Sequence, residues 1–258
     1  MKILSTKAFI VSMKKMNEAD LLINYITEDY GRITCFANNA RKSRKRFLGK
    51  LEPAMLTNIK FYEKNGISLN ILYEADIIED YKNIRKNVDI YISITKIIEI
   101  TKVLCQERDN NHGIFNLIRA VFSSLNSIEP DNSTPFSHEG AILKHELYFI
   151  SNVLKFGGIF PNFTSCTLCS KKNYDRTFLF SMKRGGVVCG DCARTIEAIS
   201  LPVNFINLSG LMIRSDPTIL KKLTVNDSML KNCVSFLEDF LSFYTGKVFN
   251  SFLTGIGA

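Results

Sequence analysis

Four cysteines carry the strongest chemical signal in the sequence. Cys166 and Cys169 form one pair with two residues between them, and Cys189 and Cys192 form a second pair after nineteen intervening residues. Each spacing fits a tight turn that aims both sulfurs at one point, and two such turns complete a tetrahedral Zn²⁺ site with Zn–S distances of ~2.3 Å. Because four protein sulfurs leave no coordination position open, the sequence predicts one structural zinc ion per chain and not a catalytic one.

Two alternatives to zinc are a pair of disulfides and four independent thiols. The N-terminus, where Lys7 soon interrupts a short apolar stretch, does not resemble a signal peptide, and no apolar run approaches the length of a membrane span. The remaining cysteines, Cys35, Cys105 and Cys233, are scattered and are expected to be small buried hydrophobic residues. This usage is typical of a reducing compartment, so we expect a cytoplasmic protein and favour zinc.

The segment between the two cysteine pairs predicts a β-hairpin. Phe178–Phe180 and Val187–Val188 are short apolar runs typical of strands, and the stretch Lys183–Gly186 separates them as a turn. A hairpin there would return the second cysteine pair to the side of the first. We therefore expect a zinc ribbon over about residues 162–194.

A second chemical signal is a run of cations at residues 38–50, which carries six positive charges and no negative one. The whole chain has a formal net charge of +8 and an isoelectric point near 9.1, which favours a polyanionic partner. A solvated loop without any partner is the alternative explanation.

Aromatic residues accompany these cations. Arg32 and Phe36 share the non-core face of the strand that precedes the loop, and we place Lys60 and Tyr62 on a neighbouring strand. Cations bind phosphates and flat rings stack on unpaired bases, so this combination suits single-stranded nucleic acid. The predicted stacking residues are Phe36 and Tyr62, and the predicted DNA-binding cations are Arg32, Arg41, Lys42, Arg44, Lys45, Arg46 and Lys60.

The elements that position the cations are short strands. The first eighty residues contain five runs with strand character, and in the third and fourth runs apolar and polar residues alternate. Asn65–Gly66 predicts a tight hairpin turn before the fifth run. Five strands in this length favour a closed OB-fold barrel, although an open five-stranded sheet would give the same pattern. The predicted strands span residues 8–11, 21–27, 32–38, 55–62 and 67–78.

Beyond residue 80 the apolar period becomes helical. The sequence predicts an α+β protein in which an OB-fold domain (1–80) precedes a mainly helical domain (81–258) that carries the zinc ribbon. Residues 128–137 are polar with two prolines and read as a linker. The predicted helices span residues 88–104, 114–125, 138–156, 208–214 and 227–244.

Motifs of common catalytic sites are missing, because the sequence has no phosphate-binding G-x-x-x-x-G-K-[ST] loop, no H-E-x-x-H and no G-x-S-x-G. We therefore expect a binding protein and not an enzyme. Three other functions stay open: a zinc-ribbon transcription or RNA-binding factor, an enzyme that uses the thiolate of Cys35 or Cys105, and an interaction scaffold.

Short blocks that share one order and spacing run along most of the chain. They are Lys7–Val11, Asn17–Leu21, Thr27–Gly31, Ala40–Arg44, Leu154–Pro161, the two cysteine pairs with Gly185–Val188, and Gly246–Lys247 with Ser251 and Leu253. In their order and spacing these blocks resemble the bacterial RecO family of recombination and repair mediators, in its zinc-bearing form. Three features depart from the family pattern: Asn39 and Ser170 stand where glycine is common, and Val248–Asn250 lacks basic residues.

The resemblance implies an N-terminal OB-fold and a helical domain with a zinc ribbon. It further implies binding of single- and double-stranded DNA, annealing of complementary strands and a location at the nucleoid. As partners it implies RecR and the acidic C-terminal tail of the single-stranded-DNA-binding protein (SSB). Together with RecR, such a protein would help to load the RecA recombinase onto SSB-coated DNA.

Overall fold

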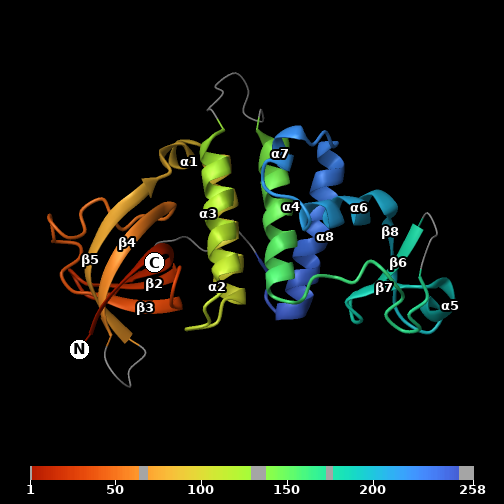
Figure 1. Ribbon diagram of the computed structural model, residues 1–258, viewed down its shortest axis with the longest axis horizontal. Coiled ribbons are helices and arrows are strands. Elements are labelled where there is room, and N and C mark those ends of the chain that lie inside the picture. The colour runs from red at the N-terminus through yellow and green to blue at the C-terminus, as the bar shows by residue number, and fades with distance from the viewer. Residues whose placement is uncertain (1, 64–68, 129–137, 173–176, 250–258) are drawn as a thin grey trace. The chain divides into compact units, whose positions relative to one another are not determined.

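The computed structural model describes residues 2–63, 69–128, 138–172 and 177–249 (Figure 1). The predicted turn at Asn65–Gly66, most of the predicted linker, and Ser251 and Leu253 of the closing block lie outside these ranges. The described chain forms two compact units, one that contains residues 2–128 together with Phe249 and one that contains residues 138–248.

The first unit is built on a five-stranded closed barrel, which confirms the predicted OB-type architecture. The strand order around the barrel is β1-β2-β3-β5-β4, and the parallel pairing of β3 with β5 completes the ring. The strands are β1 (Lys2–Lys15), β2 (Leu21–Thr27), β3 (Gly31–Ala37), β4 (Met55–Glu63) and β5 (Leu69–Asp80).

Alternation along the strands fills the barrel interior as the sequence predicts. Ile33, Cys35 and Ala37 of β3 point inward and join Ile59 and Phe61 of β4 in one buried cluster. The first strand is longer than predicted because it serves two neighbours: Lys2–Ala8 pairs with β4, while Ala8–Lys15 pairs with β2. Residues 2–7 are largely polar and do not show a clear strand pattern in the sequence. Their pairing with β4 determines their conformation.

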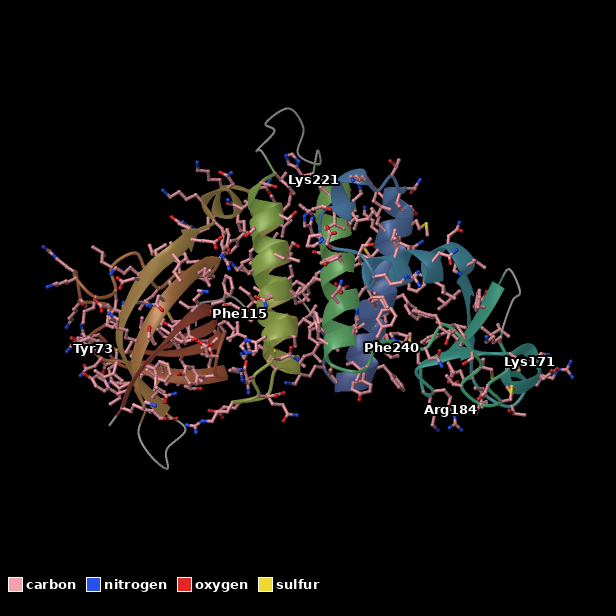
Figure 2. All side chains as sticks on the ribbon, in the orientation of Figure 1. Tyr73, Phe115, Lys171, Arg184, Lys221 and Phe240 are labelled. Atoms are coloured by element: carbon pink, nitrogen blue, oxygen red, sulfur yellow. The ribbon has the colours of Figure 1, made fainter. Side chains whose placement is uncertain are left out.

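Three helices belong to the same unit as the barrel. Phe9 points out of the barrel, and its ring centroid lies 5.4 Å from that of Phe115 and 5.3 Å from that of Phe122. Both partners are on α3, and Phe115 is labelled in Figure 2. Phe9 is 2% exposed, and burial of this outward face requires α3, which explains why the first unit extends well beyond residue 80. The helices are α1 (Lys82–Lys86), α2 (Val88–Leu104) and α3 (His112–Asn126).

The second unit combines a helical pair with a small sheet. The helices α4 and α8 pack on each other, and Phe180 of the sheet contacts Phe236 of α8 at a centroid distance of 5.0 Å. The sheet has the order β7-β6-β8, so a third strand joins the predicted hairpin. The elements are α4 (Glu139–Phe156), β6 (Thr177–Ser181), β7 (Gly186–Val188), α5 (Gly190–Ala193), β8 (Ile199–Pro202), α6 (Val203–Met212), α7 (Ile219–Lys222) and α8 (Asp227–Thr245).

A glycine at the start of β3 lies tightly against the loop that joins α2 to α3. Gly31 has φ +64°, and a Cβ atom there would lie 2.3 Å from the carbonyl oxygen of Asp109. Gly49 has a similar φ of +68°, but a Cβ atom there would meet nothing within 4 Å. Gly31 is therefore required for close packing as well as for its backbone conformation.

This pair of glycines gives a matched prediction for stability. We expect Gly49→Ala to lower the free energy of unfolding by about 1–2 kcal/mol, the cost of a left-handed non-glycine residue. Gly31→Ala adds a clash with the α2–α3 loop and should cost clearly more. Urea unfolding of both variants measures the difference, and equal losses would contradict the importance of the close contact.

Candidate nucleic-acid interface and metal centre

The four cysteines of the predicted zinc site come together in the second unit. Their Sγ atoms all lie within 4.8 Å of one another, and those of Cys169 and Cys189 are 3.6 Å apart. Thiolates around a tetrahedral zinc ion are separated by ~3.8 Å, given Zn–S distances of ~2.3 Å. The cluster therefore has the size and the donor set of a four-coordinate metal site, and these residues could hold a metal ion.

The turns that carry the cysteines are held by backbone hydrogen bonds. The Cys166 amide donates to the Lys171 carbonyl at 2.8 Å, and the Ser170 amide donates to the Cys166 carbonyl at 2.9 Å. Ser170 has φ +62°, a left-handed conformation that favours glycine. The β6–β7 hairpin then returns Cys189 to the first pair, as predicted.

The electrostatics of the cluster favour a shared cation. Burial acts to raise the pKa of the Cys166 thiol, but backbone hydrogen bonds from Cys169, Cys189 and Leu168 together lower it to about 6. Hydrogen bonds with Cys189 and Cys169 raise the pKa of Cys192 to about 12. Four thiolates so close together repel one another, and a divalent cation removes that repulsion.

The predicted basic loop, residues 38–50, lies between β3 and β4 and is anchored to the barrel. Phe47 is 2% exposed and belongs to the barrel core. The Arg46 guanidinium donates to the Asn38 carbonyl at 2.9 Å, and its Cζ atom lies 4.8 Å from the centre of the Phe47 ring. Arg41 donates to the Glu18 carbonyl at 2.9 Å, which ties the loop to the β1–β2 connection. The loop therefore has a defined path.

The seven predicted DNA-binding cations differ in their availability. Arg44 and Lys45 are exposed and make no hydrogen bond or ion pair within the described part of the chain. Arg32 instead donates to the Lys102 carbonyl at 2.8 Å, and Lys60 forms a 3.1 Å ion pair with Glu74. Lys42 lies in a weak contact of 3.8 Å with Glu18, and Arg41 and Arg46 make the contacts described above. The loop tip therefore carries the cations that are most free to bind phosphate.

The two predicted stacking residues are brought together on the outer face of the barrel. Phe36 of β3 is paired with Ile71 of β5, and Ile71 is paired with Tyr62 of β4. The sequence prediction that Lys60 and Tyr62 occupy a strand next to β3 is wrong, because β5 lies between β3 and β4 in the closed barrel. A parallel pairing of strands far apart in sequence leaves no local signal.

These residues form part of a continuous outer row across all five strands of the barrel. The register pairs link each member to the next, and the members are half-buried or exposed. Tyr73, which is 45% exposed and labelled in Figure 2, makes an edge-to-face contact of 5.6 Å with Tyr62. We call this set the outer row: Leu22, Phe36, Ile71, Tyr62 and Ile3.

The two thiols considered as possible nucleophiles are unsuited to that role. Cys35 is 0% exposed and Cys105 is 4% exposed. Burial raises the pKa of the Cys35 thiol well above its usual range and raises that of Cys105 to about 11. Both thiols are protonated at neutral pH, whereas nucleophilic cysteines need an accessible thiolate.

Comparisons with known proteins agree with this architecture. A family model described as "Recombination protein O N terminal" matches residues 1–81, and one described as "Recombination protein O C terminal" matches residues 85–251. No helix in the described ranges is long and apolar enough to cross a membrane.

Curated relatives match over most of their length. A protein named "DNA repair protein RecO" from Myxococcus xanthus is 28% identical over 79% of this chain and 78% of its own. Proteins of the same name from Syntrophus aciditrophicus and Alkaliphilus metalliredigens are 25% and 23% identical and cover 95% and 96% of this chain, and 92% and 97% of their own. The chain belongs to the RecO family of DNA repair and recombination proteins.

Proposed function

We propose that the protein binds single- and double-stranded DNA through the barrel and anneals complementary strands, without catalysing a covalent reaction. The observation that carries the proposal is the junction of the outer row with the basic loop. Phe36 and Leu22 are paired at the end of the row, and the loop leaves β3 directly after Ala37. The basic loop thus begins two residues after Phe36, which supports the joint use of its cations and the outward aromatic rings by one DNA strand.

The chemistry of this face suits a flexible single strand. Phosphates would contact the loop tip at Arg44 and Lys45, while bases would stack on Phe36 and Tyr62. Adjacent strands lie ~4.8 Å apart, so these two rings are about 10 Å apart across β5. Neutralised phosphates repel a second strand less, and stacking leaves the base edges free to pair. Annealing follows from these two effects.

The stacking part of the proposal is tested by Tyr62→Ala. Loss of one stacked base should weaken single-strand binding by about 1–3 kcal/mol, or roughly 5- to 150-fold, with little effect on duplex binding because paired bases are not available. Tyr244→Ala is the control, since Tyr244 is 60% exposed on α8. Fluorescence anisotropy with matched single-stranded and duplex oligonucleotides measures both affinities. An equal loss on both forms of DNA would contradict stacking.

We also propose zinc as the metal of the cysteine cluster.

We further propose a mediator role, in which the protein acts with RecR and helps to load RecA onto SSB-coated DNA. A transcription or RNA-binding factor would share the charge and the metal but would prefer RNA or a specific sequence. Competition between random-sequence DNA and RNA of equal length distinguishes these functions, and a clear preference for RNA would overturn the mediator proposal.

For the acidic SSB tail we propose a groove in the second unit, a cavity of about 380 Å³ between the ribbon and the end of α8. Its lining includes Phe243 and Ile199, which are 58% and 43% exposed. Lys183 and Arg184, which follow β6 in the zinc ribbon, also line it, and Arg184 is labelled in Figure 2. An apolar side chain of the tail would occupy the groove while its carboxylates pair with the two cations.

The groove predicts a charge-dependent peptide interaction. Lys183→Glu together with Phe243→Ala should abolish saturable binding of an SSB-tail peptide at moderate salt. The first substitution reverses a charge that would pair with the tail's carboxylates, and the second removes part of the apolar wall of the groove. Lys171→Glu, which changes an exposed ribbon cation that does not line the cavity, is the control. Isothermal titration calorimetry checks the result, and unchanged binding in the double variant would place the tail elsewhere.

A further inference from the structure

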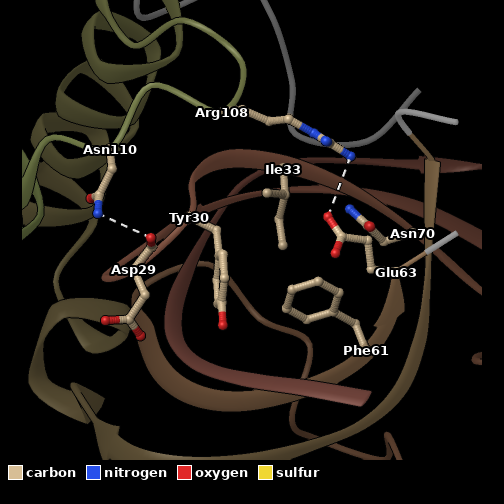
Figure 3. Close-up of a pocket in the computed structure, with 8 residues that line it drawn as sticks. All are labelled: Asp29, Tyr30, Ile33, Phe61, Glu63, Asn70, Arg108 and Asn110. Atoms are coloured by element: carbon tan, nitrogen blue, oxygen red, sulfur yellow. Dashed lines mark hydrogen bonds and ion pairs between the residues drawn. The ribbon is translucent and has the colours of Figure 1, made fainter. Parts of the chain in front are cut away.

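A second cavity opens at the end of the barrel near the β2–β3 turn. It has a volume of about 240 Å³, and Figure 3 shows the residues that line it. Tyr30, Ile33 and Phe61 supply apolar wall, with the Tyr30 and Phe61 rings edge to face at 88° and 5.6 Å between centroids. The volume is slightly below the ~300 Å³ at which most ligand pockets begin. The cavity therefore suits a small flat ligand.

One polar group in this apolar wall is left without a partner. Asn70 lines the cavity and is 2% exposed, and its Nδ2 atom donates to the Thr34 carbonyl at 3.2 Å. Its Oδ1 atom has no hydrogen-bond partner among the described residues. Buried amide oxygens are almost always satisfied, so an orphaned acceptor at a cavity wall indicates a ligand that donates an N–H or O–H group.

The rim of the cavity carries a cation in a strained position. Arg108, in the α2–α3 loop, has φ +59°, and its amide donates to the Arg32 carbonyl at 2.9 Å. Its guanidinium is 52% exposed and 3.8 Å from the Glu63 carboxylate, as the dashed line in Figure 3 shows. Asn110 fixes the same loop by donating to the Asp29 carbonyl at 3.0 Å. A long ion pair of this kind contributes little and can be exchanged for another anion.

The mouth of the cavity lies at the same end of the barrel as Tyr62 and Ile71 of the outer row. Glu63 is the last residue of β4 and Asn70 is the second residue of β5, and each is the chain neighbour of a row member. Because side chains alternate along a strand, Asn70 and Glu63 face the side of the sheet opposite to Ile71 and Tyr62. A DNA strand that stacks on Tyr62 would therefore reach the mouth of the cavity by passing over the rim of the barrel at Glu63.

We propose that this cavity takes a single unstacked nucleobase from the bound DNA strand. The base would lie against Tyr30 and Phe61 and donate a ring or amino N–H to Asn70 Oδ1, and Arg108 would pair with the adjoining phosphate. A base held in this way is withdrawn from pairing, so it marks a fixed point on the strand while its neighbours stay free. The inference rests on the proposed DNA binding and adds a base-specific site to it.

Methyl NMR of the full-length protein, labelled at isoleucine δ1 methyl groups, tests the proposal. Titration with deoxycytidine monophosphate should shift the Ile33 methyl signal through the ring current of the base, with half-saturation at about millimolar concentration. Deoxyribose 5-phosphate, which lacks a base, should leave the signal unchanged. No shift with any of the four deoxynucleoside monophosphates, or an equal shift with the sugar phosphate, would overturn the proposal.

Two variants separate base recognition from a general structural change. Asn70→Leu removes the acceptor and should weaken nucleotide binding about tenfold. It also removes the hydrogen bond to the Thr34 carbonyl, so the melting temperature should fall while the protein stays folded. Arg108→Gln, at an exposed position, should weaken deoxycytidine monophosphate but not deoxycytidine. Unchanged nucleotide affinity in the folded Asn70→Leu protein would contradict the proposed hydrogen bond. If that variant does not fold, an unchanged affinity of Arg108→Gln for deoxycytidine monophosphate would overturn the proposed site.

A titration of the unsubstituted protein with a single-stranded oligonucleotide separates the base site from the proposed DNA binding. If the oligonucleotide binds while Ile33 does not respond to nucleotides, the base site is wrong and DNA binding stands. If Ile33 responds to nucleotides while no oligonucleotide binds, the cavity is a nucleotide site and the proposed DNA function is wrong.

Discussion

Replacing Arg44 and Lys45 together with alanine is expected to weaken single-stranded DNA binding about 25-fold at about 0.1 M salt. Each phosphate contact contributes about −0.7 to the slope of log affinity against log salt, so the loss of two contacts should flatten the slope by about 1.4. Both side chains are exposed and have no partner in the described chain. The substitution should therefore leave the melting temperature unchanged, and annealing should slow.

The matched control is Arg32→Ala with Lys60→Ala, which removes the same formal charge from the same barrel. These cations are engaged by the Lys102 carbonyl and by Glu74, so we expect a much smaller change in slope. Anisotropy titrations of a labelled oligonucleotide at several salt concentrations measure both variants. A larger effect from the control pair would mean that the strand follows the barrel wall and not the loop tip.

Loss of the metal is the second large effect that we expect. Cys189→Ser should abolish stoichiometric zinc binding and unfold the ribbon, because structural zinc contributes ~10–16 kcal/mol in small finger peptides, against ~5–15 kcal/mol for the stability of a whole domain. Phe180 of β6 packs on Phe236 and Phe240 of α8. Loss of the ribbon should therefore also loosen α8 while the barrel remains folded.

Native mass spectrometry gives the metal content, and hydrogen–deuterium exchange locates the loosened region. Cys105→Ser is the control, because it changes a buried cysteine of the first unit and should retain the metal. Full metal content in Cys189→Ser, or an equal rise in exchange within the barrel, would contradict a structural zinc that supports only the second unit.

Local patterns in the sequence were sufficient for the strands of the barrel and for the cysteine cluster. The alternation of apolar and polar residues along residues 31–37 matches the inward position of Ile33, Cys35 and Ala37. The cysteine cluster could be predicted because each cysteine pair depends only on a local turn. Asn39 and Ser170, the two positions at which the resemblance led us to expect glycine, both have a left-handed backbone, with φ +53° and φ +62°.

Contacts between residues far apart in the sequence could not be predicted from local patterns. The third strand of the ribbon, Ile199–Pro202, pairs with β6 across nearly twenty residues of chain. Similarly, Lys60 looks like a free cation in sequence, whereas a partner fourteen residues later neutralises it. Pairing partners, and with them the true availability of each charge, depend on tertiary register, which a linear pattern does not encode.

The closure of the barrel has a consequence for the behaviour of the protein at high concentration. Every strand of the barrel is paired with a neighbour on each side, so none presents a wholly unpaired edge to another chain. In the ribbon, Asn162 and Thr167 hydrogen-bond along the outer edge of β7, and the short edge strand β8 ends at Pro202, which lacks an amide donor. The described sheets are thus protected against edge-to-edge aggregation, even where apolar side chains such as Ile3 face the solvent.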